Sequence, residues 1–128
     1  MENKKVILVV DDELDFLKMI RMRLEANDYM VITAINGTEA LEKVRDYKLD
    51  AVLLDVLMPG LNGLEVLKKI RQVNKDIPVF IITAFSSEDR FELAQKFAAS
   101  GFIVKTSDLK KEVDNITSFL RMSGKYKS

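Results

Sequence analysis

The folded part of the chain opens with Val6-Ile7-Leu8-Val9-Val10-Asp11-Asp12, five apolar residues followed directly by two acids. Apolar side chains on successive residues are typical of a strand that is covered on both faces, because neighbouring side chains of a strand point to opposite faces. Similar runs occur at 31–34, 51–54 and 79–83, and a weaker one occurs at 102–104. The sequence therefore predicts five strands of a parallel sheet.

Segments with helical periodicity separate these strands. In the first of them, Leu17, Ile20 and Leu24 recur at spacings of three and four residues. The strict alternation of strand and helix predicts an α/β fold, (βα)5 and doubly wound, with a five-stranded parallel sheet of order 2-1-3-4-5. The expected helices cover 14–26, 39–47, 64–73, 88–98 and 108–120, the last two with Ser87 and Ser107 as N-caps.

Composition excludes several classes of function. The chain has 128 residues, of which 48% are hydrophobic, and this suffices for one folded domain. The absence of Cys and His excludes thiol catalysis and the usual zinc ligands. Twenty basic residues balance twenty acidic ones, which argues against direct binding of nucleic acid. We expect a domain of residues 1–122 and a polar tail of residues 123–128.

The apolar run near the start of the chain bears on location. Its five residues, 6–10, are too few for the core of a signal peptide or for a membrane span. We therefore expect a cytoplasmic protein without membrane contact.

Polar residues follow the predicted strands at their carboxyl ends: Asp11 and Asp12, then Asp55, Thr83 and Lys105. These ends meet at one edge of a parallel sheet, and strands 1 and 3 are adjacent in the expected order. Three carboxylates placed together repel one another unless a hard cation such as Mg²⁺ or Mn²⁺ binds them. With an ammonium and a hydroxyl nearby, this set can accept a phosphoryl group.

Each of these residues also has an ordinary structural interpretation. Asp12 can cap the first helix, and Asp55 can belong to a turn before Pro59. Thr83 suits a strand as a β-branched residue, and Lys105 can be a solvated surface residue. Their common position at one sheet edge favours the functional interpretation.

The sequence resembles the receiver domain of two-component response regulators, a flavodoxin-like fold, over nearly the whole chain. The resemblance implies that Asp55 is the phosphoacceptor. It also implies that Asp11 and Asp12 hold the metal, completed by Asp55 and the main-chain carbonyl of Leu57. The segments that carry it are Val9-Val10-Asp11-Asp12-Glu13, Leu53-Leu54-Asp55-Val56-Leu57-Met58-Pro59-Gly60-Leu61-Asn62-Gly63, Ile77-Pro78-Val79-Phe80-Ile81-Ile82-Thr83-Ala84 and Phe102-Ile103-Val104-Lys105.

The same resemblance implies a switch. Thr83 would hydrogen-bond the phosphoryl group and Lys105 would pair with it, while Phe102 would turn inward when Thr83 moves. These movements would shift a two-state equilibrium of the face made by helix 4, strand 5 and helix 5, and this face would bind an output protein.

The chain departs from the family pattern at three places. Thr106 replaces the proline that usually follows the strand-5 lysine, and Ala98 stands where a glycine near the end of helix 4 is usual. Ser100-Gly101 replaces the acidic pair of receivers that dimerise on the helix 4–strand 5–helix 5 face. We therefore expect a monomer or a weak dimer.

Two bulky apolar residues, Leu57 and Phe85, flank the mouth of the expected site. Neither can orient an attacking water, which predicts slow self-hydrolysis of the phosphoryl group. Alternatively, both side chains face solvent or a partner.

The sequence thus predicts a phosphoprotein of a two-component phosphorelay. It would be phosphorylated by a sensor histidine kinase or a histidine phosphotransfer protein and would not be an enzyme, although it assists its own phosphorylation and dephosphorylation. A start at Met1 and a polar end favour a stand-alone receiver. The alternatives are an unphosphorylated receiver-like binding module and a receiver cut from a regulator with a DNA-binding or other output domain. A haloacid-dehalogenase-type phosphatase would need an acid at Leu57, an FMN site would be repelled by Asp11-Asp12-Glu13, and no P-loop motif is present.

Overall fold

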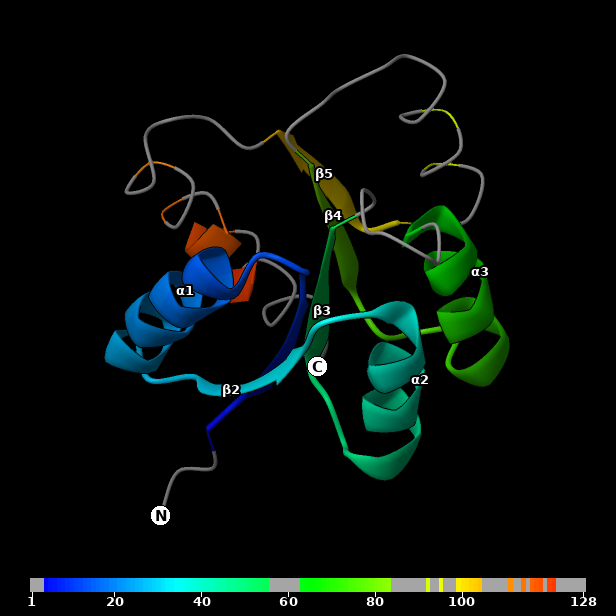
Figure 1. Ribbon diagram of the computed structural model, residues 1–128, viewed down its shortest axis with the longest axis horizontal. Helices are drawn as coiled ribbons and strands as arrows, with labels where there is room; N and C mark the ends of the chain where they lie inside the picture. Colours follow the sequence, from blue (N-terminus) through cyan, green and yellow to red (C-terminus); the bar gives the residue numbers. More distant parts are fainter. Residues whose placement is uncertain are drawn as a thin grey trace.

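A parallel five-stranded sheet forms the centre of the computed structural model (Figure 1). Its strands, in the spatial order β2-β1-β3-β4-β5, are β1 (Val6–Val10), β2 (Met30–Ala34), β3 (Ala51–Asp55), β4 (Val79–Thr83) and β5 (Gly101–Val104). The helices with described bounds are α1 (Leu14–Ala26), α2 (Gly37–Asp46) and α3 (Gly63–Val73). The structure describes residues 4–55, 63–83, 92, 95, 99–104, 111, 114, 116–118, 120 and 121, and at 83 and 101–104 it describes the main chain alone. The predicted fold and strand order are confirmed.

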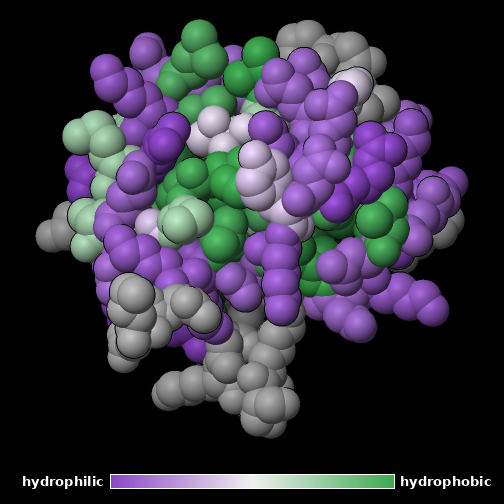
Figure 2. All heavy atoms as spheres, turned by 90° about the horizontal axis from the view of Figure 1, so that it is seen from below, coloured by the Kyte–Doolittle hydropathy of each residue, from purple (hydrophilic) through white to green (hydrophobic). Residues whose placement is uncertain are grey.

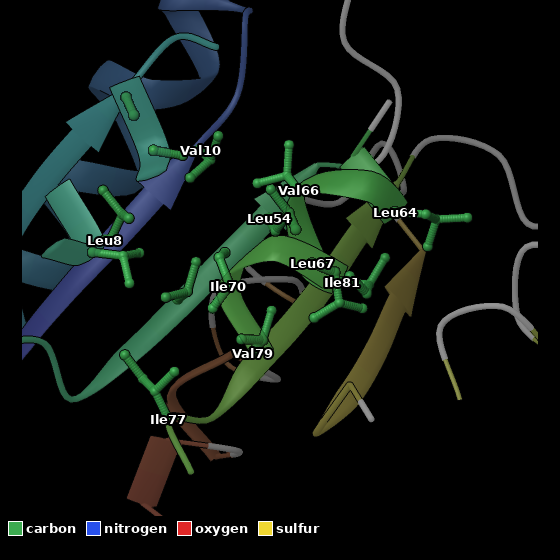
Figure 3. Packing of buried hydrophobic residues seen from close by; sticks show 14 residues of the cluster. Leu8, Val10, Leu54, Leu64, Val66, Leu67, Ile70, Ile77, Val79 and Ile81 are labelled. Carbon is green, nitrogen blue, oxygen red and sulfur yellow. The ribbon is translucent and has the colours of Figure 1, made fainter. Parts of the chain in front are cut away.

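Helices cover both faces of the sheet. α1 lies on one face with the helical residues 116–118, 120 and 121, whereas α2 and α3 lie side by side on the other (Figure 1). Ile7 and Val9 of β1 join the cluster beneath α1, and Leu8 and Val10 join the cluster beneath α2 and α3. Figure 3 shows the second cluster, in which residues of α3 pack on β3 and β4. Because both faces of the sheet are covered, successive residues of a strand are mostly apolar.

The predicted element bounds agree closely with the structure. The observed bounds equal the predicted ones for β1, β4 and α1. The observed element is one residue longer than predicted for β2, β3, β5 and α3. α2 begins two residues earlier than expected, at Gly37, because Asn36 caps the helix and draws the following residues into its first turn. In the expected helix 88–98, residues 92 and 95 are helical. Ser87, Ser107 and Ala98 lie outside the described residues.

The strand register brings the functional residues to one edge. Val10 of β1 pairs with Leu54 of β3. The next residue of each chain segment, Asp11 and Asp55, therefore lies at the same end of two adjacent strands. Figure 2 views the opposite end of the molecule, from below the view of Figure 1, and shows hydrophilic side chains around a small apolar area. Among the described residues, no helix is long and apolar enough to cross a membrane.

Candidate metal centre

Three carboxylates meet at the carboxyl ends of β1 and β3. Asp11, Asp12 and Asp55 each offer one oxygen, and these atoms all lie within 4.8 Å of one another. Asp11 is 1% exposed and Asp55 is 4% exposed, whereas Asp12 faces solvent. The predicted acidic cluster is therefore present, with two members buried and one open to an incoming ligand.

Backbone contacts fix the first of these acids. The main-chain N–H of Asp11 donates to the carbonyl oxygen of Ala34, at the end of β2, with an N···O distance of 3.1 Å. The Oδ1 atom of Asp11 accepts the N–H of Glu13 at 2.9 Å. Both ends of this residue are thus held, its main chain by β2 and its carboxylate by the start of α1.

The start of α1 decides one question that the sequence left open. The N-cap residue is Glu13, which is in an extended conformation and whose side chain makes no capping hydrogen bond. Asp12 is therefore not the N-cap residue of this helix, and its interpretation as the cap is wrong. The unpaired N–H groups at a helix start carry partial positive charge, which favours acids at this place.

The donor set fits a hard divalent cation. Repulsion between two unit charges 4 Å apart is worth about 1 kcal/mol in water and about 4 kcal/mol near a protein surface. A cation bound by oxygen removes this repulsion, and a few carboxylates completed by water are what Mg²⁺ prefers. The residues present therefore fit Mg²⁺ or a similar ion such as Mn²⁺.

Of the remaining predicted site residues, the structure describes only the main chains of Thr83 and Phe102. Thr83 ends β4 and pairs in register with Val104, and Phe102 of β5 pairs with Ile81. Their main chains thus lie in neighbouring strands, and Thr83 lies one residue past the Asp55–Ile82 pair. Leu57, Phe85 and Lys105 lie outside the described residues, as does the Lys105–Thr106 peptide bond.

A pair of residues beside the site was missed in the sequence. Asn36 Oδ1 accepts the N–H of Glu39, and Glu39 Oε1 accepts the N–H of Ile35. This is a variant of the capping box, in which Glu39 accepts the N–H of Ile35, one residue before the N-cap Asn36. The spacing Asn-x-x-Glu was the signal that could have revealed it.

A groove lies along α1. It has a volume of about 360 Å³ and is lined by Asp15, Lys18, Met19, Met22, Arg23 and Ala26. Leu14, which is 68% exposed, lies between this groove and the acidic cluster in the chain. The groove thus combines apolar and charged side chains of one helix, which begins two residues after Asp12.

Comparison with known proteins identifies the class. Residues 7–117 match the response regulator receiver domain. The chain belongs to this family, the receiver domains of two-component systems.

Particular relatives agree with this assignment. The transcriptional regulatory protein PrrA of Mycobacterium bovis is 34% identical over 118 residues, which are 92% of this chain and 51% of PrrA. The chain thus spans about half the length of this relative.

Two solved structures are similar over almost their whole length. Response regulator TrrA of Thermotoga maritima, in complex with Mg²⁺-BeF, has a TM-score of 0.79 and 36% identity, covering 90% of this chain and 98% of that one. The phosphorylated cyanobacterial phytochrome response regulator RcpA has a TM-score of 0.85 and 26% identity, covering 93% and 95%.

Proposed function

We propose that this receiver takes a phosphoryl group from a phosphohistidine of another protein onto Asp55. The observation that carries the proposal is the position of Asp55, which is buried at the end of β3 with Asp11 and Asp12 beside it. RcpA, a similar response regulator solved in its phosphorylated form, supports phosphorylation of this receiver. Asp55 acts as a signalling acceptor in this scheme and not as the nucleophile of an enzyme with a separate substrate.

The proposed transfer is a single in-line displacement. An Oδ atom of Asp55 attacks phosphorus, the bond from phosphorus to the histidine nitrogen breaks, and that nitrogen takes up a proton from solvent. Asp11 and Asp12 would hold the divalent cation, most simply Mg²⁺, which neutralises charge on the phosphoryl oxygens when it is bound. TrrA, solved with Mg²⁺-BeF, supports this choice of cation. Lys105 and Thr83 would bind the remaining oxygens.

The consequence of phosphorylation is a change of charge at the edge of the sheet. An acyl phosphate on Asp55 adds negative charge beside the end of β4. In the proposed switch, Thr83 and Phe102 transmit this change to the face of helix 4, strand 5 and helix 5, which then binds an output protein. PrrA is a transcriptional regulatory protein, so control of transcription is the output that its name supports.

We further propose that the phosphohistidine protein docks on the groove of α1. A donor must bring its imidazole to Asp55, and α1 begins next to the acidic cluster. Met19 and Met22 give an adaptable apolar contact, and Lys18 and Arg23 favour an acidic rim on the donor.

The decisive experiment is intact mass after incubation with Mg²⁺ and a small acyl phosphate. We expect the wild type to gain one phosphoryl group, and Asp55→Asn to gain none. Asp28→Asn is a matched control, because Asp28 is an exposed acid in a positive-φ conformation that Asn also adopts. An equal gain by wild type and Asp55→Asn would place the phosphoryl group on another residue and contradict the proposal, whereas no gain by the wild type would favour an unphosphorylated binding module.

A further inference from the structure

The capping box at the start of α2 connects with the metal centre through the end of β2. Asn36 Oδ1 accepts the N–H of Glu39 at 2.8 Å, and Glu39 Oε1 accepts the N–H of Ile35 at 3.0 Å. The two hydrogen bonds together hold the turn between β2 and α2 in one conformation. Because Ile35 directly follows the last residue of β2, they fix the main chain at that point.

The next link runs from β2 to the acidic cluster. The carbonyl oxygen of Ala34 accepts the N–H of Asp11 at 3.1 Å. The path from Glu39 through Ile35 and Ala34 to Asp11 is therefore a continuous series of hydrogen bonds and peptide units. Asp11 is almost fully buried, so its carboxylate cannot compensate for a displaced main chain by turning into solvent.

We propose that Glu39 and Asn36 are positioning residues of the metal centre. They hold the Ala34 carbonyl where it orients Asp11 for the cation, although neither side chain is itself a member of the acidic cluster. Groups that orient metal ligands are known to change metal affinity when they are removed. This inference rests on the proposed Mg²⁺ site.

Charge alone is the competing explanation. Glu39 carries a negative charge, and such a charge can attract a cation without positioning any metal ligand. Glu39→Gln separates the two effects, because its amide oxygen can still accept the Ile35 N–H while the charge is lost. Glu39→Ala removes both the charge and the hydrogen bond. Glu42→Ala is the matched control, since Glu42 is an exposed acid on the same helix.

The first test measures the dissociation constant of Mg²⁺ by NMR titration of the backbone amides. We expect Glu39→Ala to raise it about 3- to 10-fold, less than for a residue that bonds a ligand's side chain directly. Glu39→Gln and Glu42→Ala should stay within about twofold of the wild type, in line with weak exposed charges. An unchanged constant in Glu39→Ala, or an equal loss in Glu39→Gln, overturns the proposal.

A second measurement needs no variant and remains decisive if Glu39→Ala does not fold. Coupling between two sites is reciprocal, so Mg²⁺ bound to the wild type must stabilise the capping box. We expect saturating Mg²⁺ to slow hydrogen exchange at the Ile35 amide more than at the Tyr47 amide, which bonds to Lys43 at the far end of α2. Equal slowing at both amides overturns the proposal. Failure of the wild type to bind Mg²⁺ at all overturns the metal site as well, which distinguishes the two failures.

Discussion

Asp11 and Asp55 lie at the ends of two adjacent parallel strands, with an oxygen of each within 4.8 Å of the other and both side chains buried. Two buried carboxylates at this separation oppose folding, because each loses water and each repels the other. The fold therefore places repulsion between two acids at the site where a cation and a phosphoryl group are expected. This conflict between stability and function has a measurable consequence.

Asp55→Asn should raise stability in metal-free buffer. We expect the free energy of unfolding with a chelator to increase by about 1–2 kcal/mol, because the variant removes one of the repelling charges. The increase that Mg²⁺ causes in the wild type should be largely lost in the variant. Urea unfolding with and without Mg²⁺ measures both effects. Asp28→Asn is the control, and a variant less stable than wild type without metal would refute the argument.

Arg71 should stabilise the loop that leads into β4. Its Nη1 atom donates to the carbonyl oxygens of Ile77 at 2.6 Å and Asn74 at 3.4 Å. Burial lowers the pKa of Arg71, and the charge of Asp76 opposes this shift. Arg71→Met should lower the free energy of unfolding by about 1.5–3 kcal/mol, the usual contribution of a hydrogen bond from a charged donor. Lys69→Met, exposed on the same helix, is the control in urea unfolding. An equal loss in both variants would show that the loop contact is unimportant.

Much of the fold and of the acidic cluster could be predicted from the sequence, and the reason is local. The apolar runs mark each strand, and an acid directly after a run must lie at the carboxyl edge of a parallel sheet, as Asp11 and Asp55 do. The role of Asp12 could not be predicted, because an acid at this place serves equally as a cap or as a metal ligand. Distance and burial resolve that ambiguity.

Contacts that span a turn were harder to predict. The hydrogen bond from the Ile35 N–H to the Glu39 carboxylate depends on the direction of a side chain that helical periodicity does not specify. The second contact, the hydrogen bond from the Asp11 N–H to the Ala34 carbonyl oxygen, depends on the pairing of β1 with β2. That pairing is known only once the strand order is known. The positioning role therefore required the structure, whereas the acids themselves did not.

If the donor protein docks on the groove of α1, a change in the groove should slow phosphorylation by a phosphohistidine protein but not by a small acyl phosphate. Met22→Glu places a charge in the apolar part of the groove without touching the acidic cluster. We expect at least a tenfold slower transfer from a phosphohistidine protein that phosphorylates the wild type, because a buried interface contact is often worth about 1–2 kcal/mol. Phosphorylation by a small acyl phosphate should be unchanged. Radiolabel transfer time courses with both donors measure this, with Glu25→Gln as an exposed control on α1. Equal rates for Met22→Glu and wild type with the protein donor would place docking elsewhere.

Leu57 and Phe85 predict a long-lived phosphoryl group. Both lie outside the described residues, and the expectation rests on their positions two residues after Asp55 and Thr83. An apolar side chain at the mouth of the site cannot orient water for attack on phosphorus, whereas a polar one can. Leu57→Asn combined with Phe85→Glu should therefore speed phosphate loss by about tenfold, a small part of what positioning can contribute. The measurement is the decay of phosphorylated protein after the donor is removed, followed by intact mass. Leu57→Val with Phe85→Leu keeps both positions apolar and should decay like the wild type, and unchanged decay of the polar variant would show that neither residue controls access of water.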